Sequence, residues 1–247
     1  MTVLVGIKCQ DGVVIGSDSA TTFSDGVERV IEQPSKKIEI IEKRIILACT
    51  GAVGLEQRFS AVLRQCHAKK AFSGKNAIEF MKAVSKAGID DFIETHVQFG
   101  NIGALVAFPA AGKELSLCEL ALKDFQPELK DNNLWYGSMG GGQRIADPFL
   151  GFIRKVFWQD APPNLSEGIF AALWTLNHVI DVNPGGVNGP AQIATLRLEG
   201  GEPVASILSN QELQEHNDNV SAAESYLREY RTRFHHPSAK ALPEPSK

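Results

Sequence analysis

Residues 1–18 read MTVLVGIKCQDGVVIGSD, and this stretch decides how the chain is interpreted. β-Branched residues dominate on both sides of Asp11-Gly12, a dipeptide that is the strongest short-range signal for a hairpin. We therefore predict two antiparallel strands, at residues 2–9 and 13–19, joined by a two-residue turn at Asp11-Gly12.

Thr2 carries the first candidate chemistry. Removal of the initiator methionine would leave it with a hydroxyl and a free α-amine, whose pKa of about 7.7–8.0 suits a general base near neutral pH. In the predicted register Thr2 lies opposite Thr21, and Asp18 lies about 10 Å along the strand, too far for direct proton transfer. A cation between Thr2 and Asp18 could couple them, and Lys36 and Lys37 are the candidates.

Composition and charge limit the classes of function. The 247 residues are 43% hydrophobic and 22% charged, which suits one large domain, and no apolar run approaches a membrane span. A net charge of −4 implies no basic face, so we expect neither nucleic acid nor a membrane as a partner. The first apolar run lacks the basic flank of a signal peptide, and the four cysteines form no CxxC pair. They indicate reduced thiols in a cytoplasmic protein.

The rest of the chain predicts clusters of strands separated by pairs of helices. We expect strands at 38–41, 44–49, 101–108, 115–122, 133–137, 191–198 and 204–208, and helices at 53–67, 75–93, 143–158, 166–180 and 222–234. Clustered strands favour antiparallel sheets over alternating βαβ units. We expect one domain at residues 2–210, followed by a C-terminal helix and a mobile tail at 211–247.

Together these residues resemble the N-terminal half of a proteasome-type β subunit, a family of N-terminal-nucleophile hydrolases. The likeness rests on Thr2, Gly6, Asp11 to Val14, Ser17-Asp18, Thr21-Thr22 and Lys36-Lys37-Ile38. It extends to residues 48–52, which resemble the family's oxyanion turn, and to residues 136–141, which resemble its Gly-Ser-Gly segment. The chain is most similar to the small bacterial proteasome homologues. The resemblance implies an α+β fold, a four-layer αββα sandwich of two antiparallel sheets flanked by helix pairs.

The resemblance also implies catalytic roles for single residues. Thr2 would be the nucleophile and its amine the base, while Asp18 would orient Lys37, whose ammonium lowers the pKa of the hydroxyl. Ser138 would form a hydrogen bond with the α-amine. Asp181 would steady the threonine.

Three further residues would bind the substrate. The amide of Thr50 would donate to the oxyanion, and Thr22 would pair with the substrate backbone as an added strand. Ala48 would lie near the pocket for the side chain that precedes the cleaved bond. Three positions depart from the family, because Pro184 stands where serine is usual, Thr50 where glycine is usual and Ala20 where arginine is frequent. Residues 187–190 are an apparent insertion.

The implied function is that of a threonine endopeptidase. It would hydrolyse peptide bonds of unfolded polypeptides inside a self-compartmentalised homo-oligomer, most simply a double ring, and would need no cofactor or metal. Whether an ATPase partner feeds it is left open. Two alternatives remain: an N-terminal-nucleophile amidohydrolase acting on small amides, and a catalytically inactive ring subunit. Intact Asp18 and Lys37 count against the inactive subunit, whereas a retained Met1 would favour it.

The helices at 75–93 and 143–158 are unusually rich in aromatic residues for helices that each cover one sheet face. They carry Phe80, Phe92, Phe149, Phe152, Phe157 and Trp158. We expect some of these side chains to contact neighbouring subunits.

Overall fold

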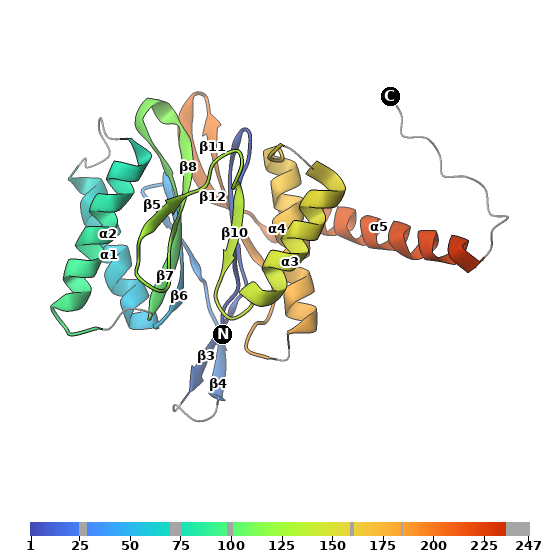
Figure 1. Ribbon diagram of the computed structural model, residues 1–247, viewed down its shortest axis with the longest axis horizontal. Coiled ribbons are helices and arrows are strands. Elements are labelled where there is room, and N and C mark those ends of the chain that lie inside the picture. Colours follow the sequence, from blue (N-terminus) through green and yellow to red (C-terminus); the bar gives the residue numbers. More distant parts are fainter. Residues whose placement is uncertain (25–28, 70–75, 98–100, 159–160, 184, 236–247) are drawn as a thin grey trace.

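Two five-stranded antiparallel sheets face each other at the centre of the structure (Figure 1). The computed structural model describes all residues except 25–28, 70–75, 98–100, 159–160, 184 and 236–247. The strands are β1 (Leu4–Lys8), β2 (Gly12–Ser17), β3 (Ala20–Ser24), β4 (Arg29–Pro34), β5 (Ile38–Ile41), β6 (Ile45–Gly51), β7 (Ile102–Pro109), β8 (Leu115–Leu120), β9 (Pro127–Leu129), β10 (Tyr136–Met139), β11 (Gln192–Glu199) and β12 (Glu202–Ile207). One sheet has the order β10-β1-β2-β11-β12, the other β5-β6-β7-β8-β9, and β3 and β4 form a separate ribbon.

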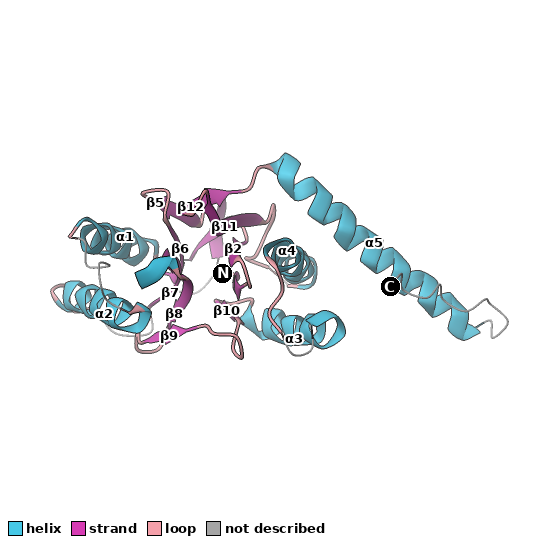
Figure 2. Ribbon diagram, turned by 90° about the horizontal axis from the view of Figure 1, so that it is seen from above, coloured by secondary structure: helices cyan, strands magenta, loops and turns pink. Residues whose placement is uncertain are grey.

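A pair of helices covers the outer face of each sheet (Figure 2). The helices are α1 (Val53–Ala68), α2 (Ala77–Ile93), α3 (Gln143–Ile153), α4 (Leu165–Val182) and α5 (Asn210–His235), and a π-helical turn, Arg154–Trp158, continues α3. Helices α1 and α2 pack on the β5–β9 sheet, and α3 and α4 pack on the sheet that holds β1 and β2. The expected α+β class, with antiparallel sheets and helices, is confirmed.

Three apolar clusters hold these elements together. The cluster between the two sheets contains fully buried residues of both, such as Ile15 and Leu105. The other two lie between each sheet and its helices. At the start of α4, the side chain of Asn164 accepts a hydrogen bond from the amide of Glu167 at 3.0 Å, and the carboxylate of Glu167 accepts one from the amide of Asn164 at 2.9 Å. This reciprocal cap fixes where the helix begins.

The N-terminal hairpin forms, but the predicted register is wrong. Lys8 pairs with Val13, and the amide of Cys9 donates to the carbonyl of Gly12 at 2.8 Å, so the turn residues are Gln10 and Asp11. Gly12 is already in β2, where a Cβ atom would lie 2.8 Å from a backbone oxygen of β11. The glycine is needed for close packing of strands and not for the turn. Extending this register places Ser19, not Thr21, opposite Thr2.

Several elements differ from the sequence-based predictions. The β3–β4 ribbon and the short β9 were not predicted, and the ribbon projects below the sheets in Figure 1. Helix α5 begins at Asn210, earlier than the predicted residue 222, and the expected mobile tail from residue 236 onward lies outside the described residues. In the part of the chain that the structure describes, no helix has the length and apolar character needed to cross a membrane.

Candidate active site

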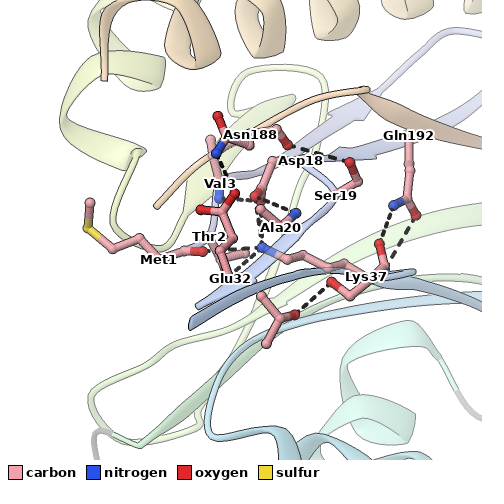
Figure 3. Close-up of polar contacts among 12 residues, drawn as sticks. Met1, Thr2, Val3, Asp18, Ser19, Ala20, Glu32, Lys37, Asn188 and Gln192 are labelled. Carbon is pink, nitrogen blue, oxygen red and sulfur yellow. Dashed lines mark hydrogen bonds and ion pairs between the residues drawn. The ribbon is translucent and has the colours of Figure 1, made fainter. Parts of the chain in front are cut away.

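Lys37 lies between Thr2 and Asp18 (Figure 3). Its Nζ atom donates to Thr2 Oγ1 at 3.1 Å and to the two carboxylate oxygens of Asp18 at 2.8 and 2.9 Å. Asp18 is fully buried and Lys37 is only 6% exposed, so the pair attracts in a medium that screens charge poorly. One cation therefore links the threonine hydroxyl to a carboxylate.

Backbone contacts fix both members of the ion pair. Asp18 follows β2, and its two oxygens accept hydrogen bonds from the amides of Val3 at 3.0 Å and Ala20 at 3.2 Å. The amide of Lys37 donates to Gln192 Oε1 at 3.3 Å, and Gln192 in turn donates to the carbonyl of Ser35 at 2.7 Å. The sequence analysis missed Gln192, because nothing in the chain indicates that β11 borders the start of β5.

Burial lowers the pKa of Lys37 below its ordinary value, and the carboxylate of Asp18 opposes this shift. The ammonium also donates to the carbonyl oxygen of Met1 at 3.2 Å. With Met1 in place, the nitrogen of Thr2 is a peptide amide and cannot accept a proton. The charged side chains are thus assembled around Thr2, while a free amine at this position requires cleavage after Met1.

A cleft of about 390 Å³ opens over Thr2. Its lining residues come from the N-terminus, the β3 strand, the end of β6 and the start of α1; they are Met1, Thr2, Thr21, Thr22, Phe23, Lys37, Cys49, Thr50, Gly51, Ala52, Val53, Glu56 and Gly141. The hydroxyl of Thr2 is therefore reachable from a groove bounded by two strands. Thr22 lies on the wall of this groove, and its role in substrate binding stays a prediction.

The end of β6 directs the amide of Gly51 away from β7. The amide of Ala52 donates to the carbonyl of Asn101 at 3.0 Å, on the β7 side. Because amides alternate along an antiparallel strand, Thr50 also points its amide toward β7, and Gly51 points its amide to the opposite side. Gly51 has φ +125°, and a Cβ atom there would lie 2.1 Å from the carbonyl oxygen of Asn101. The amide of Gly51, and not that of Thr50, is therefore free of the β6–β7 pairing, and an oxyanion donor at this turn stays a prediction.

Comparison with known proteins shows which family the chain resembles. The model of the family described as "Proteasome subunit" matches residues 2–90. A "Proteasome subunit beta" of Nanoarchaeum equitans is 29% identical over 149 residues, which cover 59% of this chain and 70% of that protein. The first third of the chain is therefore similar to proteasome subunits. The resemblance read from the sequence is confirmed.

Solved structures described as Anbu share the fold of this chain. A Gly-1 mutant from Hyphomicrobium sp. strain MC1 superposes with a TM-score of 0.72, and Anbu from Yersinia bercovieri, described as an ancestral β-subunit, with 0.70. Each is 13% identical, covering 98% of this chain and 100% of its own. The Anbu complex from Pseudomonas aeruginosa, described as a helical assembly, has a TM-score of 0.69 at 14% identity, covering 98% of each chain. At this identity the likeness establishes the fold alone.

Two residues that the proteasome resemblance assigned to the site do not reach Thr2. Ser138 lies in β10 opposite Val5, and its hydroxyl donates to Asp147 Oδ1 at 2.6 Å, on the side of α3. Asp181 is exposed near the end of α4 and forms no hydrogen bond or ion pair with the described residues. The roles predicted for Ser138 and Asp181 are therefore corrected.

Other groups take the places next to the threonine. The amide of Gly142 donates to the carbonyl of Thr2 at 3.1 Å, and a Cβ atom on Gly140 would lie 2.3 Å from that oxygen. Asn188 accepts a hydrogen bond from the amide of Ser19 at 2.9 Å, next to Asp18 (Figure 3). The sequence analysis placed the glycine-rich segment correctly near Thr2 but chose a residue of the segment that faces elsewhere.

Ala48 also lies outside the cleft. It is fully buried between the two sheets, whereas its neighbour Cys49 lines the cleft. Successive residues of a strand point to opposite faces, so the predicted role of Ala48 is wrong by one position.

Glu56 is a titratable group of the cleft that the sequence analysis missed. It lies in the first turn of α1, where acidic residues are common because they stabilise the amino end of a helix. Burial raises the pKa of Glu56 to about 7, the nearby Lys37 lowers it, and Glu39 adds to the increase. The cleft therefore carries an acid that changes charge near neutral pH.

Proposed function

We propose that this protein is a member of the proteasome family and a threonine peptidase that acts through Thr2 after removal of Met1. One observation carries the proposal: Lys37 Nζ lies 3.1 Å from Thr2 Oγ1 and is held in place by a fully buried carboxylate. An ammonium at this distance favours the ionised hydroxyl and lowers its pKa. Catalysis requires an ion pair held at this distance from the hydroxyl, whereas a purely structural subunit requires no such ion pair.

The reaction follows from the groups around Thr2. The free α-amine removes the proton of the hydroxyl, and Oγ1 attacks the carbonyl carbon of the substrate. The amide of Gly51 donates to the oxyanion that forms, and the amine passes its proton to the leaving nitrogen as the C–N bond breaks. Water then attacks the resulting ester with the amine again as base, which releases the acid and restores Thr2. No cofactor takes part in these steps.

An extended polypeptide fits the cleft as a substrate. The groove runs between β3, which carries Thr22, and the end of β6, so a peptide can pair with an exposed strand edge as it approaches Thr2. Pairing of this kind uses backbone groups and therefore favours unfolded chains over folded proteins.

We further propose that identical subunits enclose this site in a ring, most simply two stacked rings. The succession of helix pair, sheet, sheet and helix pair supports the four-layer αββα sandwich of the family. Enclosure protects folded proteins from a peptidase of broad specificity. The proposal includes no nucleic acid or membrane partner.

Cleavage of a fluorogenic peptide library by purified Thr2 variants tests the proposal. Thr2→Ala removes the hydroxyl and should abolish cleavage, whereas Thr2→Ser keeps both reacting groups and should retain measurable activity. Undiminished cleavage by the alanine variant would rule out Thr2 as the nucleophile.

A catalytically inactive subunit is the second candidate, and it requires that Met1 is retained. Met1 lies in the cleft, where its carbonyl oxygen accepts a hydrogen bond from Lys37. A Cβ atom added to Gly141 would lie 2.7 Å from the sulfur of Met1. A chain that keeps Met1 has no free amine at Thr2 and would serve only in assembly.

A further inference from the structure

A second cavity, of about 340 Å³, opens beside the cleft over Thr2. The two cavities adjoin, because they share the lining residues Thr21, Lys37, Val53 and Glu56. Lys37 Nζ lies 3.1 Å from Thr2 Oγ1, so the boundary between the cavities lies next to the atom that attacks the substrate in the proposed reaction. The side chain of the residue whose carbonyl is attacked can therefore enter the second cavity.

The wall of the second cavity is mostly polar. In addition to the four shared residues it contains Ser35, Lys36, Glu39, Gln57 and Ser60. The hydroxyl of Thr21 donates to that of Ser35 at 2.6 Å. The hydroxyl of Ser60 donates to Glu39 Oε2 at 2.7 Å. An apolar side chain in this cavity would displace water from polar atoms and offer them no hydrogen bond in return, which weakens binding.

Three of the four charged groups on this wall are either paired or open to solvent. Lys37 Nζ lies 2.8 Å from Asp18 Oδ1, and Glu39 forms an ion pair with Arg64. Lys36 is exposed, so water and salt screen its charge. None of these three groups provides an unscreened charge for a substrate.

Glu56 is the fourth charged group, and its carboxylate points to the chemistry of the side chain that fits. It is partly buried in the first turn of α1 and forms no hydrogen bond or ion pair with any residue that the structure describes. Burial raises the pKa of Glu56 to about 7, Lys37 lowers it, and Glu39 adds to the increase. A cation that entered the cavity would stabilise the ionised form that burial disfavours.

We propose that Glu56 makes the second cavity select a basic side chain, lysine or arginine, in the residue that precedes the cleaved bond. The proposal rests on the peptidase function proposed above and names its preferred substrate. The cationic group donates to the carboxylate of Glu56, and the neighbouring hydroxyl oxygens accept its remaining hydrogen bonds. An acidic side chain is repelled by Glu56 and Glu39, and an apolar one leaves the polar wall without partners.

Peptides that differ only in the residue before the cleaved bond test this preference. The three residues are lysine, its uncharged analogue norleucine, and glutamate. At pH 8 kcat/KM for the lysine peptide should exceed that for the norleucine peptide by about ten- to a hundredfold, as expected for a hydrogen bond between charged groups. This ratio should fall by about five- to tenfold from pH 8 to pH 6, because Glu56 loses its charge while lysine keeps its own. Ionisation of the catalytic amine affects both peptides equally and cancels in the ratio.

Two variants separate Glu56 from the rest of the protein. Glu56→Gln should remove both the preference for lysine and its dependence on pH. Glu79→Gln is the matched control, because it removes an exposed carboxylate in the first turn of α2, and it should keep the wild-type ratio. A preference for glutamate, a ratio near one in wild type, or an unchanged ratio in Glu56→Gln overturns the proposal.

Binding to Thr2→Ala protein tests the selection without any cleavage. In fluorescence anisotropy the lysine peptide should bind more tightly than the norleucine peptide, and adding Glu56→Gln should remove the difference. Equal affinities, or no binding of either peptide, overturn the proposal. Tighter binding of the lysine peptide to a protein whose wild type cleaves neither would contradict the peptidase function and support the selection by Glu56. Cleavage of both peptides at equal rates would do the reverse.

Discussion

Two adjacent lysines differ in the residues they can reach. Lys37 is buried and contacts Thr2 and Asp18, whereas Lys36 is exposed, because neighbouring residues of an extended chain point to opposite sides. The sequence could indicate that only one of them joins Thr2 to Asp18. The resemblance to the family selected Lys37, and the structure places that residue between the two.

Lys37→Ala should reduce peptide turnover by about two to four orders of magnitude, whereas Lys36→Ala should change it little. Lys37→Arg should also fail, since a planar guanidinium does not replace a compact ammonium at 3.1 Å from Thr2 Oγ1. Losing Lys37 leaves Asp18 buried without a counter-charge, at a cost of about 3–5 kcal/mol in stability. Turnover should therefore be measured at a temperature where unfolding scans show each variant folded. An inactive Lys36 variant beside an active Lys37 variant would refute the assignment.

Glu56 should make the stability of the protein depend on pH near neutrality. Its pKa rises from an ordinary 4.5 to about 7 on folding, so its contribution to stability is complete below pH 4.5 and is lost as the pH rises through about 7. Glu56→Gln cannot ionise and should lose less stability than wild type between pH 5 and pH 8.

Thermal unfolding at these two pH values measures the effect. Glu229→Gln, which removes an exposed carboxylate of α5, is the matched control and should follow wild type. If Glu56→Gln and wild type lose the same stability over this range, Glu56 does not titrate as described.

At the scale of elements, the strands and helices that bury an apolar face were predictable, and those that do not were missed. The strands β5 and β6 and the helices α1 and α4 lie close to the predicted ranges because their apolar periodicity is strong. The β3–β4 ribbon exposes Phe23 and Ile31, so its sequence carries no burial pattern. This ribbon forms one wall of the cleft, and sequence periodicity alone could not have supplied it.

Register was less predictable than the existence of strands. The shift in the first hairpin, the choice of Ala48 over Cys49 and the choice of Thr50 over Gly51 are all errors of one or two positions along a strand. Such errors arise because close contacts between distant strands fix the register, as at Gly12 against β11. The residue types of the site were predictable from sequence, but the faces on which they lie were not.

Gly51→Ala should reduce peptide turnover by about two to three orders of magnitude. A side chain at φ +125° is strained and would collide with Asn101, which displaces the amide proposed as oxyanion donor. Gly54→Ala is the matched control in the first turn of α1, because a Cβ atom there meets nothing within 4 Å. Steady-state kinetics on both variants checks this, and equal activity in the two would contradict the assignment of Gly51.

At the scale of the whole molecule, the aromatic residues divide between core and surface. Phe80 and Phe92 of α2 are buried under their own helix layer, so neither is available for a contact between subunits. Phe152 and Phe157, in α3 and the turn that follows it, are each 46% exposed. Contacts between subunits are therefore expected on the α3 side and not on the α2 side.

Native mass spectrometry at physiological salt should show a homo-oligomer. We expect the active sites to cleave peptides only in this assembled state. Fractions should be assayed for peptide cleavage as they elute from gel filtration, with activity expected only in the assembled peak. A stable monomer that cleaves peptides would contradict the enclosed chamber and would favour a hydrolase of small amides.

The central claim is that Thr2 works as a free N-terminal residue beside Lys37, and the intact mass of active protein tests it most directly. The intact mass of preparations with different extents of Met1 removal should be measured, and the same preparations should be assayed in parallel on one peptide substrate. The cleavage rate should rise in proportion to the fraction of chains that begin at Thr2, since only these possess the amine base. Full activity in protein that uniformly retains Met1 would contradict the account.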